Sequence, residues 1–194
     1  MTSLRDTVFV FTRAPRLGTV KRRLACAIGD RAALRFHVAT LHRLVRALAR
    51  DRRFRTVLAV TPDGGFIPGL KGVARVGQGR GNLGARMARV LGLSRRGRAA
   101  IIGSDIPQAG ARDVHAAFRA LGRVDAVFGP AVDGGYWLVG VGVRRVSRPF
   151  AGVRWSSEHA LGDTLANFGG VRVGLLRVLS DVDTAADLAR VRSV

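Results

Sequence analysis

Short apolar runs alternate along the chain with longer segments in which apolar and polar positions repeat at helical spacing. The apolar runs predict strands at residues 7–12, 56–61, 73–76, 99–103, 126–129, 136–141 and 171–178. The clearest helical segment has apolar residues at steps of three and four, namely Leu34, Val38, Leu41, Val45 and Leu48. Further helical patterns lie at residues 83–93, 111–121, 158–168 and 185–191.

This alternation predicts an α/β protein with helices on both faces of a sheet. The run "AAIIG" at residues 99–103 is apolar throughout, as expected for a parallel strand covered on both sides. The runs at 126–129 and 136–141 are joined only by "PAVDGG", which is too short for a crossover helix and indicates an antiparallel strand. We therefore expect a three-layer α/β/α sandwich with a mixed, mainly parallel sheet, and one domain over residues 1–194.

The segments that follow the strands carry the candidate chemistry. They are "TRAPRLGTVKRRLA" after the first strand, "GQGRGNLGARM" after the third, "SDIPQ" after the fourth and "PAVDGGY" after the fifth. Ligands of open α/β sheets bind at the carboxyl ends of the strands, so all four segments are predicted to share one edge. Cations such as Lys21 beside the carboxylates of Asp105 and Asp133 indicate a site for a metal and a nucleotide.

Each segment also has a purely structural interpretation. Asp105, followed by Ile106 and Pro107, is typical of a turn after a strand, and "DGG" at 133–135 is typical of a hairpin turn. "GQGRGNLG" matches neither the Rossmann nor the Walker spacing. Asp181 and Asp183 are interpreted as caps of the last helix, where Thr184 and Asp187 match a capping box. The histidines, which lie in helical patterns without metal-ligand spacing, are interpreted as surface or packing residues: His37, His42, His115 and His159.

Charge adds a second hypothesis. The formal net charge of +20 favours a polyanionic partner, with nucleic acid as the obvious candidate. Against specific nucleic-acid binding, the arginines are spread over nearly every segment and few aromatic residues are available to stack on bases. Only Lys21 and Lys71 are lysines, so arginine usage is interpreted as a compositional habit of the source genome. The single cysteine, Cys26, excludes an internal disulfide, and without a membrane-spanning run a cytoplasmic location is expected.

Six motifs in order resemble the bacterial GT-A-like family of nucleotide-diphospho-sugar transferases, which includes glycosyltransferases of arsenosugar biosynthesis. They are "FTRAPRLGTVKRRLA", "GNLGARM", "IIGSDIP", "FGPAVDGGYWLVG", "WSS" and "DVDTAADL". The first loop is also similar, more distantly, to that of molybdenum-cofactor and phospholactate guanylyltransferases. The resemblance implies the GT-A fold, a nucleotide-activated substrate and Mg²⁺ or Mn²⁺.

The same resemblance implies roles for individual residues. Asp105 would coordinate the metal, Lys21 would contact the phosphates, and Asp133 would act on the acceptor side or supply a second metal contact. The remaining substrate-binding residues would be Thr12, Arg13, Pro15, Gly18, Arg22, Gly84, Gly134, Gly135 and Tyr136. The chain departs from the family pattern at three positions, where it has Arg22, Asn82 and Ser104.

These observations lead to one preferred function and two alternatives. The preferred function is metal-assisted transfer of a sugar from a nucleotide-diphospho-sugar to a small-molecule acceptor, with Asp133 accepting the acceptor's proton. The first alternative is nucleotidyl transfer from a nucleoside triphosphate, with release of pyrophosphate. The second is nucleic-acid binding through the arginine-rich surface. The nucleotide base, the sugar and the oligomeric state, a homodimer included, stay open.

Overall fold

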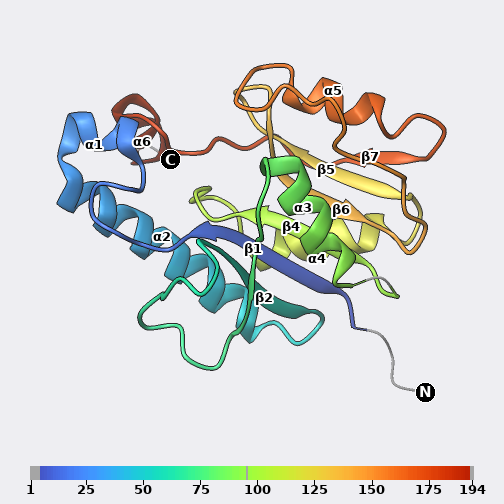
Figure 1. Ribbon diagram of the computed structural model, residues 1–194, viewed down its shortest axis with the longest axis horizontal. Coiled ribbons are helices and arrows are strands. Elements are labelled where there is room, and N and C mark those ends of the chain that lie inside the picture. Colours follow the sequence, from blue (N-terminus) through green and yellow to red (C-terminus); the bar gives the residue numbers. More distant parts are fainter. Residues whose placement is uncertain (1–4, 95, 193–194) are drawn as a thin grey trace.

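A seven-stranded sheet forms the middle layer of the computed structural model, which describes residues 5–94 and 96–192 (Figure 1). The strands are β1 (Thr7–Arg13), β2 (Arg55–Thr61), β3 (Ala74–Gly77), β4 (Ala99–Gly103), β5 (Ala126–Pro130), β6 (Tyr136–Val141) and β7 (Val173–Leu175). Their order across the sheet is β3-β2-β1-β4-β6-β5-β7. Only β6 runs antiparallel to its neighbours, β4 and β5, so the predicted mixed, mainly parallel sheet is confirmed.

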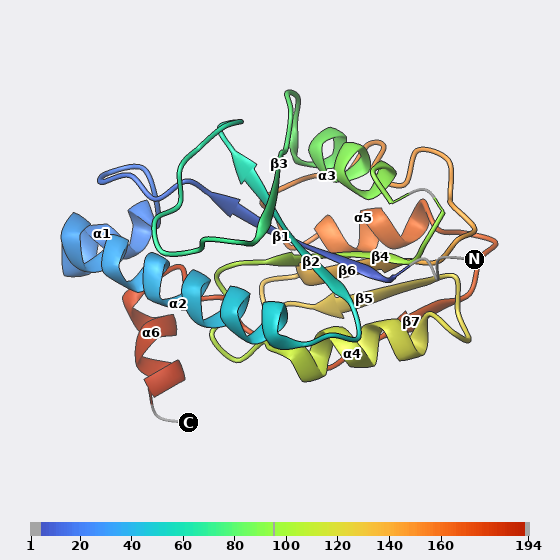
Figure 2. The same ribbon diagram turned by 90° about the horizontal axis from the view of Figure 1, so that it is seen from below.

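Helices cover both faces of the sheet. They are α1 (Arg22–Ile28), α2 (Asp30–Arg50), α3 (Leu83–Gly92), α4 (Ala111–Ala120), α5 (Ala160–Ala166) and α6 (Ala185–Arg192). In Figure 2, α2 and α4 lie on one side of the sheet and α3 and α5 on the other, while α1 and α6 lie together at one end of the molecule. The predicted α/β/α sandwich is therefore confirmed. None of the helices in the described ranges is long and apolar enough to cross a membrane.

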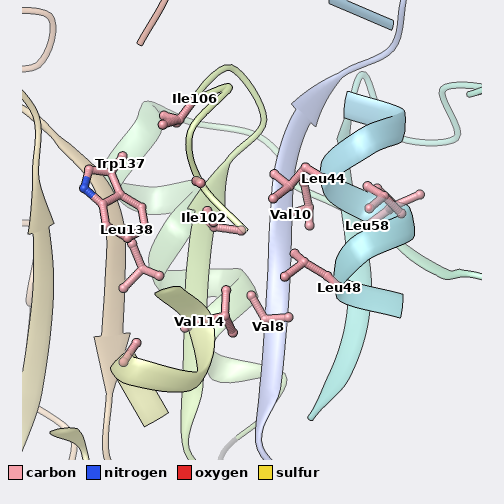
Figure 3. Packing of buried hydrophobic residues seen from close by; sticks show 14 of the residues in the cluster. Val8, Val10, Leu44, Leu48, Leu58, Ile102, Ile106, Val114, Trp137 and Leu138 are labelled. Atoms are coloured by element: carbon pink, nitrogen blue, oxygen red, sulfur yellow. The ribbon is translucent and has the colours of Figure 1, made fainter. Parts of the chain in front are cut away.

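The period-two alternation of β1 divides the core into two layers. Val8 and Val10 face α2 and α4, where they pack with Leu44 and Leu48 (Figure 3). Phe9 points to the opposite face and packs with side chains of α3 and α5. Because β1 is central and buried on both faces, its carboxyl end, where Arg13 leads into the first loop, is held in a fixed place.

The main differences from the sequence prediction lie at the last strand and around the first helices. The predicted last strand at 171–178 is shortened to β7, an edge strand whose Leu175 is 60% exposed. The helix expected around Leu34 and Leu48 is α2, and the short helix α1 before it is separated from it by Gly29, whose φ of 81° lies in the left-handed region that glycine adopts without strain. This break allows α1 to turn away from α2 and to pack against Val182 near the carboxyl terminus.

Candidate functional site

Lys21 stands at the end of the loop that follows β1. Its backbone lies in the left-handed region, with φ 49° and ψ 46°, and it occupies the position immediately before α1. This turn directs the side chain inward, so that only 6% of it is exposed. The Lys21 Nζ donates hydrogen bonds to Asp105 Oδ2 at 2.9 Å and to Asp183 Oδ1 at 2.7 Å. The Lys21 ammonium thus links the first loop to Asp105 after β4 and to Asp183 in the carboxyl-terminal segment.

Asp105 follows β4, next to β1 in the sheet. The preceding residue, Ser104, is buried, and its hydroxyl donates a hydrogen bond to Thr12 Oγ1 at 3.1 Å, which ties together the ends of the two strands. The Asp105 carbonyl accepts a hydrogen bond from the backbone N–H of Val182 at 3.3 Å. Val182 is fully buried, so the segment 181–183 is anchored beside Asp105.

Three carboxylates meet at this point. One oxygen from each of Asp105, Asp181 and Asp183 lies within 4.8 Å of the other two. Lys21 bonds to Oδ2 of Asp105 and Oδ1 of Asp183, while Oδ2 of Asp183 lies 3.9 Å from the exposed guanidinium of Arg23. Each carboxylate therefore keeps acceptor capacity for another cation. Hard divalent cations prefer such oxygen ligands and complete their shells with water and substrate phosphates, so these residues fit Mg²⁺ or Mn²⁺.

The concentration of negative charge shifts the pKa values of the cluster. Burial, followed by repulsion from the carboxylates of Asp105, Asp183 and Asp133, raises the pKa of Asp181 to about 6. Burial alone would lower the pKa of the Lys21 ammonium, but attraction to Asp105 and Asp183 outweighs burial and leaves that pKa above its ordinary value. The cluster therefore favours a bound cation, because cations reduce the repulsion among its carboxylates.

A cavity of about 370 Å³ opens beside the cluster. Asp105, Asp133 and Asp181 line it, together with Gly135 and Tyr136 of the β5–β6 connection. The Asp133 carboxylate accepts a hydrogen bond from the Gly135 N–H at 2.9 Å, which orients it within the turn. "DGG" therefore forms the hairpin turn and also places a carboxylate in the cavity, so the two interpretations of this motif are compatible.

Several of the other sequence-predicted residues have structural contacts here. Thr12 is buried, and its hydroxyl oxygen accepts the hydrogen bond from Ser104. The Arg13 carbonyl lies 3.1 Å from the His37 Nε2. Gly84 is buried in the first turn of α3, where an added Cβ would come within 2.8 Å of Phe150 Cβ. Gly134 has a φ of 83° and passes so close to the Glu158 backbone that a side chain would collide with it.

The remaining members lie at the surface of the first loop or in the cavity wall. Pro15 is half-buried, whereas Gly18 and Arg22 are exposed; Gly18 has a φ of 72°. Tyr136 packs its ring at 80° to that of Phe128, with a centroid distance of 5.4 Å, and burial raises the pKa of its hydroxyl. Asn82, at a position where the chain departs from the family pattern, caps α3 by accepting a hydrogen bond from the Ala85 N–H at 2.9 Å.

Sequence reasoning did not place Asp181 and Asp183 in the cluster. The predicted capping box of Thr184 and Asp187 is present: the Thr184 N–H donates to the Asp187 carboxylate at 2.8 Å, and the Asp187 N–H donates to the Thr184 hydroxyl at 3.3 Å. Asp181 and Asp183 instead face Asp105. The available signal was the "DVD" spacing, because residues two apart in an extended segment point to the same side.

Solved structures share this fold over nearly the whole chain. A protein of Desulfovibrio desulfuricans G20, provisionally described as a nucleotide-diphospho-sugar transferase, is 25% identical; the match covers 96% of this chain and 85% of that protein, with a TM-score of 0.84. Rv0371c of Mycobacterium tuberculosis H37Rv in complex with manganese is 18% identical, covers 98% and 100% of the two chains, and gives a TM-score of 0.56. 4-Diphosphocytidyl-2C-methyl-D-erythritol synthase of Anaerococcus prevotii DSM 20548 is 10% identical; the match covers 97% of both chains and has a TM-score of 0.63.

The comparison with curated proteins gives no match. A family model matches residues 45–157, more than half of the chain and including Asp105 and Asp133; its description is "Uncharacterized protein conserved in bacteria". The chain therefore belongs to this bacterial family, DUF2064, and has a fold found in solved nucleotide-diphospho-sugar transferases and cytidylyl-transferring enzymes.

Proposed function

We propose that this protein is a metal-dependent transferase that moves a sugar from a nucleotide-diphospho-sugar to a small-molecule acceptor. The observation that carries the proposal is the cluster of Asp105, Asp181 and Asp183 with Lys21, at the carboxyl edge of the sheet and beside a cavity. The relative from Desulfovibrio desulfuricans, similar over 96% of this chain, supports a sugar-nucleotide donor. The manganese complex of Rv0371c supports a divalent metal in a protein of the same fold.

Asp105, Asp181 and Asp183 would hold Mg²⁺ or Mn²⁺. The metal, when bound, would neutralise charge on the diphosphate leaving group. The Lys21 ammonium, which already lies at the cluster, would contact oxygens of the same diphosphate. The first loop, from Thr12 to Arg22 and including Arg13, Pro15 and Gly18, would surround the nucleotide. Gly84, Gly134, Gly135 and Tyr136 would shape the opposite wall.

The acceptor would bind in the cavity near Asp133. Its nucleophilic oxygen would form a bond to the anomeric carbon while the bond from that carbon to the diphosphate oxygen breaks. The acceptor's proton would pass to a carboxylate, with Asp133 as the first candidate because it lines the cavity and is oriented by Gly135. The products would be the glycosylated acceptor and a nucleoside diphosphate.

Nucleotidyl transfer is the second candidate, since the cytidylyl-transferring synthase of Anaerococcus prevotii has the same fold. In that reaction the acceptor would attack the α-phosphorus of a nucleoside triphosphate and release pyrophosphate. The higher identity to the sugar-nucleotide relative favours glycosyl transfer. The leaving group separates the two: a nucleoside diphosphate supports the preferred reaction, whereas pyrophosphate supports the alternative.

A thermal-shift screen tests the proposal. Nucleoside diphosphates, nucleotide sugars and nucleoside triphosphates are added with Mn²⁺, with Mg²⁺ and with a chelator. A nucleotide sugar at about 100 times its dissociation constant should add about 2.7 kcal/mol to the free energy of unfolding, and only with metal. Stabilisation by DNA alone, lost steeply as salt increases, would instead support the nucleic-acid-binding alternative.

A further inference from the structure

The cavity beside the acidic cluster has a charge opposite to that of the whole protein. Asp105, Asp133 and Asp181 line it, and its lining, as far as the described residues form it, contains no lysine, arginine or histidine. This is unexpected in a chain with 33 basic and 13 acidic residues. Lys21, which would serve the diphosphate, is not among the lining residues. The Lys21 ammonium instead bonds to Asp105, one of the three lining carboxylates.

An arginine that is adjacent in sequence to the cavity lining is held in an ion pair with Asp163. Arg154 precedes the lining residue Trp155, and its guanidinium forms a two-pronged pair with Asp163 at 2.8 and 2.9 Å. The Arg154 backbone N–H also bonds to Asp163, at 3.0 Å. These three bonds fix the segment 154–157 so that it contributes Trp155, Ser156 and Ser157 to the cavity, without a positive charge.

The walls of the cavity are largely apolar and partly aromatic. β1 contributes Phe11, α3 contributes Leu83 and Met87, and the Trp155 ring lies edge-on to Tyr136 with a centroid distance of 6.4 Å. Gly84 allows α3 to approach this wall closely, since its missing Cβ would lie 3.0 Å from Trp155 Cζ2. Such a surface favours contact with carbon atoms of a ligand.

The backbone of Ser156 is a further sign of a built site. Ser156 is not glycine, yet its φ is 60°, and strained conformations of this kind persist where the surrounding structure enforces them, frequently at ligand sites. Its neighbour Ser157 donates its hydroxyl to the Arg154 carbonyl at 2.7 Å. The turn therefore places Ser156 and Ser157 in the lining of the cavity as polar residues beside its apolar walls.

We infer that this cavity binds the acceptor, and that the acceptor is a small molecule with an apolar or aromatic body, an uncharged or cationic head and no phosphate or carboxylate. The inference rests on the proposed transferase function and specifies its substrate class. The apolar walls would bind the body, while the carboxylate of Asp133, which lines the cavity and is not one of the proposed metal ligands, would attract a hydroxyl or ammonium head and repel an anion.

Three matched probes test the inference without activity. 2-Phenylethanol, 2-phenylethylamine and phenylacetate differ in head charge but share the phenyl group and a short linker. Trp137 and Trp155, the only tryptophans in the chain, both line the cavity, so intrinsic fluorescence reports its occupancy. Titrations are made in chelator, because a bound metal would attract the carboxylate of phenylacetate.

We expect saturable fluorescence changes with the alcohol and the amine, and binding of phenylacetate at least tenfold weaker. Leu83→Arg would place a cation in the wall and should remove or reverse this preference. Leu93→Arg, at a 58% exposed leucine just beyond the same helix, is the matched control and should keep it. Circular dichroism establishes that both variants are folded.

Equal or tighter binding of phenylacetate to the wild type, or no saturable binding of any probe, would overturn the inference. Calorimetry of a nucleoside diphosphate with Mn²⁺, on the same wild-type sample, separates this failure from failure of the proposed function. Nucleotide binding without the probe preference rejects only the acceptor class. The probe preference without nucleotide binding rejects the transferase proposal and, with it, the assignment of the cavity's ligand as an acceptor.

Discussion

At the scale of single residues, Lys21 is unusual because nearly all the other basic residues of the chain are arginines. Away from the cluster, the acidic residues of the described chain that form ion pairs do so mainly with arginine, for example Asp6 with Arg98 and Asp113 with Arg177. The acidic cluster instead holds one of only two lysines. A compact ammonium can occupy the space between two carboxylates that the broader, planar guanidinium fills less readily.

Replacing Lys21 by methionine tests this role. Lys21→Met keeps the buried stem but leaves Asp105 and Asp183 without their shared partner, so in chelator the free energy of unfolding should fall by about 1–2 kcal/mol. Mn²⁺ should then stabilise the variant more than the wild type, since the ammonium no longer competes for the carboxylates. Urea unfolding with and without Mn²⁺ measures both effects. Lys71→Met, at the other, exposed lysine, is the control; equal behaviour of the two variants would contradict the role of Lys21.

His37 gives a prediction of pH dependence. Its ring is buried in α2 beside the Arg13 carbonyl, and burial lowers its pKa from the ordinary 6.5. The unfolded chain therefore takes up a proton near pH 6.5 that the folded protein refuses until a lower pH, so stability falls as the pH decreases below about 6.5. Urea midpoints of wild type and His37→Gln at pH 7.5 and 5.5 should show a smaller loss in the variant. His159→Gln, at an exposed histidine, should lose as much stability between pH 7.5 and 5.5 as the wild type. If His37→Gln lost as much stability as these two proteins, the buried His37 would not be the group responsible.

Part of the site could be predicted from sequence at this scale, because strand ends are local features. Asp105 and Asp133 follow strands whose direction the pattern predicts, and both line the cavity. Lys21 is brought to Asp105 by the same topology. The contribution of Asp181 and Asp183 depends on where the chain passes after an edge strand, which periodicity does not encode. From the sequence, Asp181 and Asp183 are also interpreted as caps of the last helix, a role that the adjacent Thr184 and Asp187 fill in the structure.

At the scale of elements, helix α3 contributes side chains both to the hydrophobic core and to the cavity wall. Its first turn contains Gly84, whose close contact with Phe150 and Trp155 allows the helix to lie near the cavity wall. Its last residue, Gly92, has open space where a Cβ would lie, with no atom within 4 Å. The two glycines thus form a matched pair in one helix.

Alanine at the two positions should have opposite effects. Helix propensity favours alanine over glycine by about 1 kcal/mol, so Gly92→Ala should leave stability unchanged or raise it slightly. Gly84→Ala should destabilise the protein by about 1–3 kcal/mol, because its Cβ would collide with the Phe150 backbone and side chain. Thermal unfolding, followed by the fluorescence of Trp137 and Trp155, distinguishes them. Equal stabilisation by both substitutions would show that α3 can move away from the wall at no cost.

Most elements were predictable because their periodicity reflects burial. The helix at 83–93 and the strands at 99–103 and 136–141 match α3, β4 and β6 within one residue. The failures have local causes. The short helix α1 is separated from α2 by Gly29, and β7, which pairs only with β5 at the edge of the sheet, is shorter than the predicted strand.

At the scale of the whole molecule, the basic surface and the acidic site have separate roles. Four of the 13 acidic residues, at positions 105, 133, 181 and 183, gather at the carboxyl edge of the sheet. The arginines are spread over the rest of the chain, and in the proposed function this distribution would draw anionic nucleotides toward the protein from a distance. Local binding would then depend on a cation between the carboxylates and the phosphates. Nucleotide binding should therefore depend on metal as well as on the overall charge.

Calorimetric titration of a nucleoside diphosphate into wild type, Asp105→Asn and Asp51→Asn tests this requirement most directly. Asp51 pairs with Arg53 beyond the end of α2, so its substitution removes a charge of the same sign away from the cluster. We predict that Mn²⁺ tightens binding at least tenfold, about 1.4 kcal/mol, relative to chelator in wild type and Asp51→Asn. In Asp105→Asn this difference should disappear while the fold is retained. Metal-dependent binding that persists in Asp105→Asn would contradict the account.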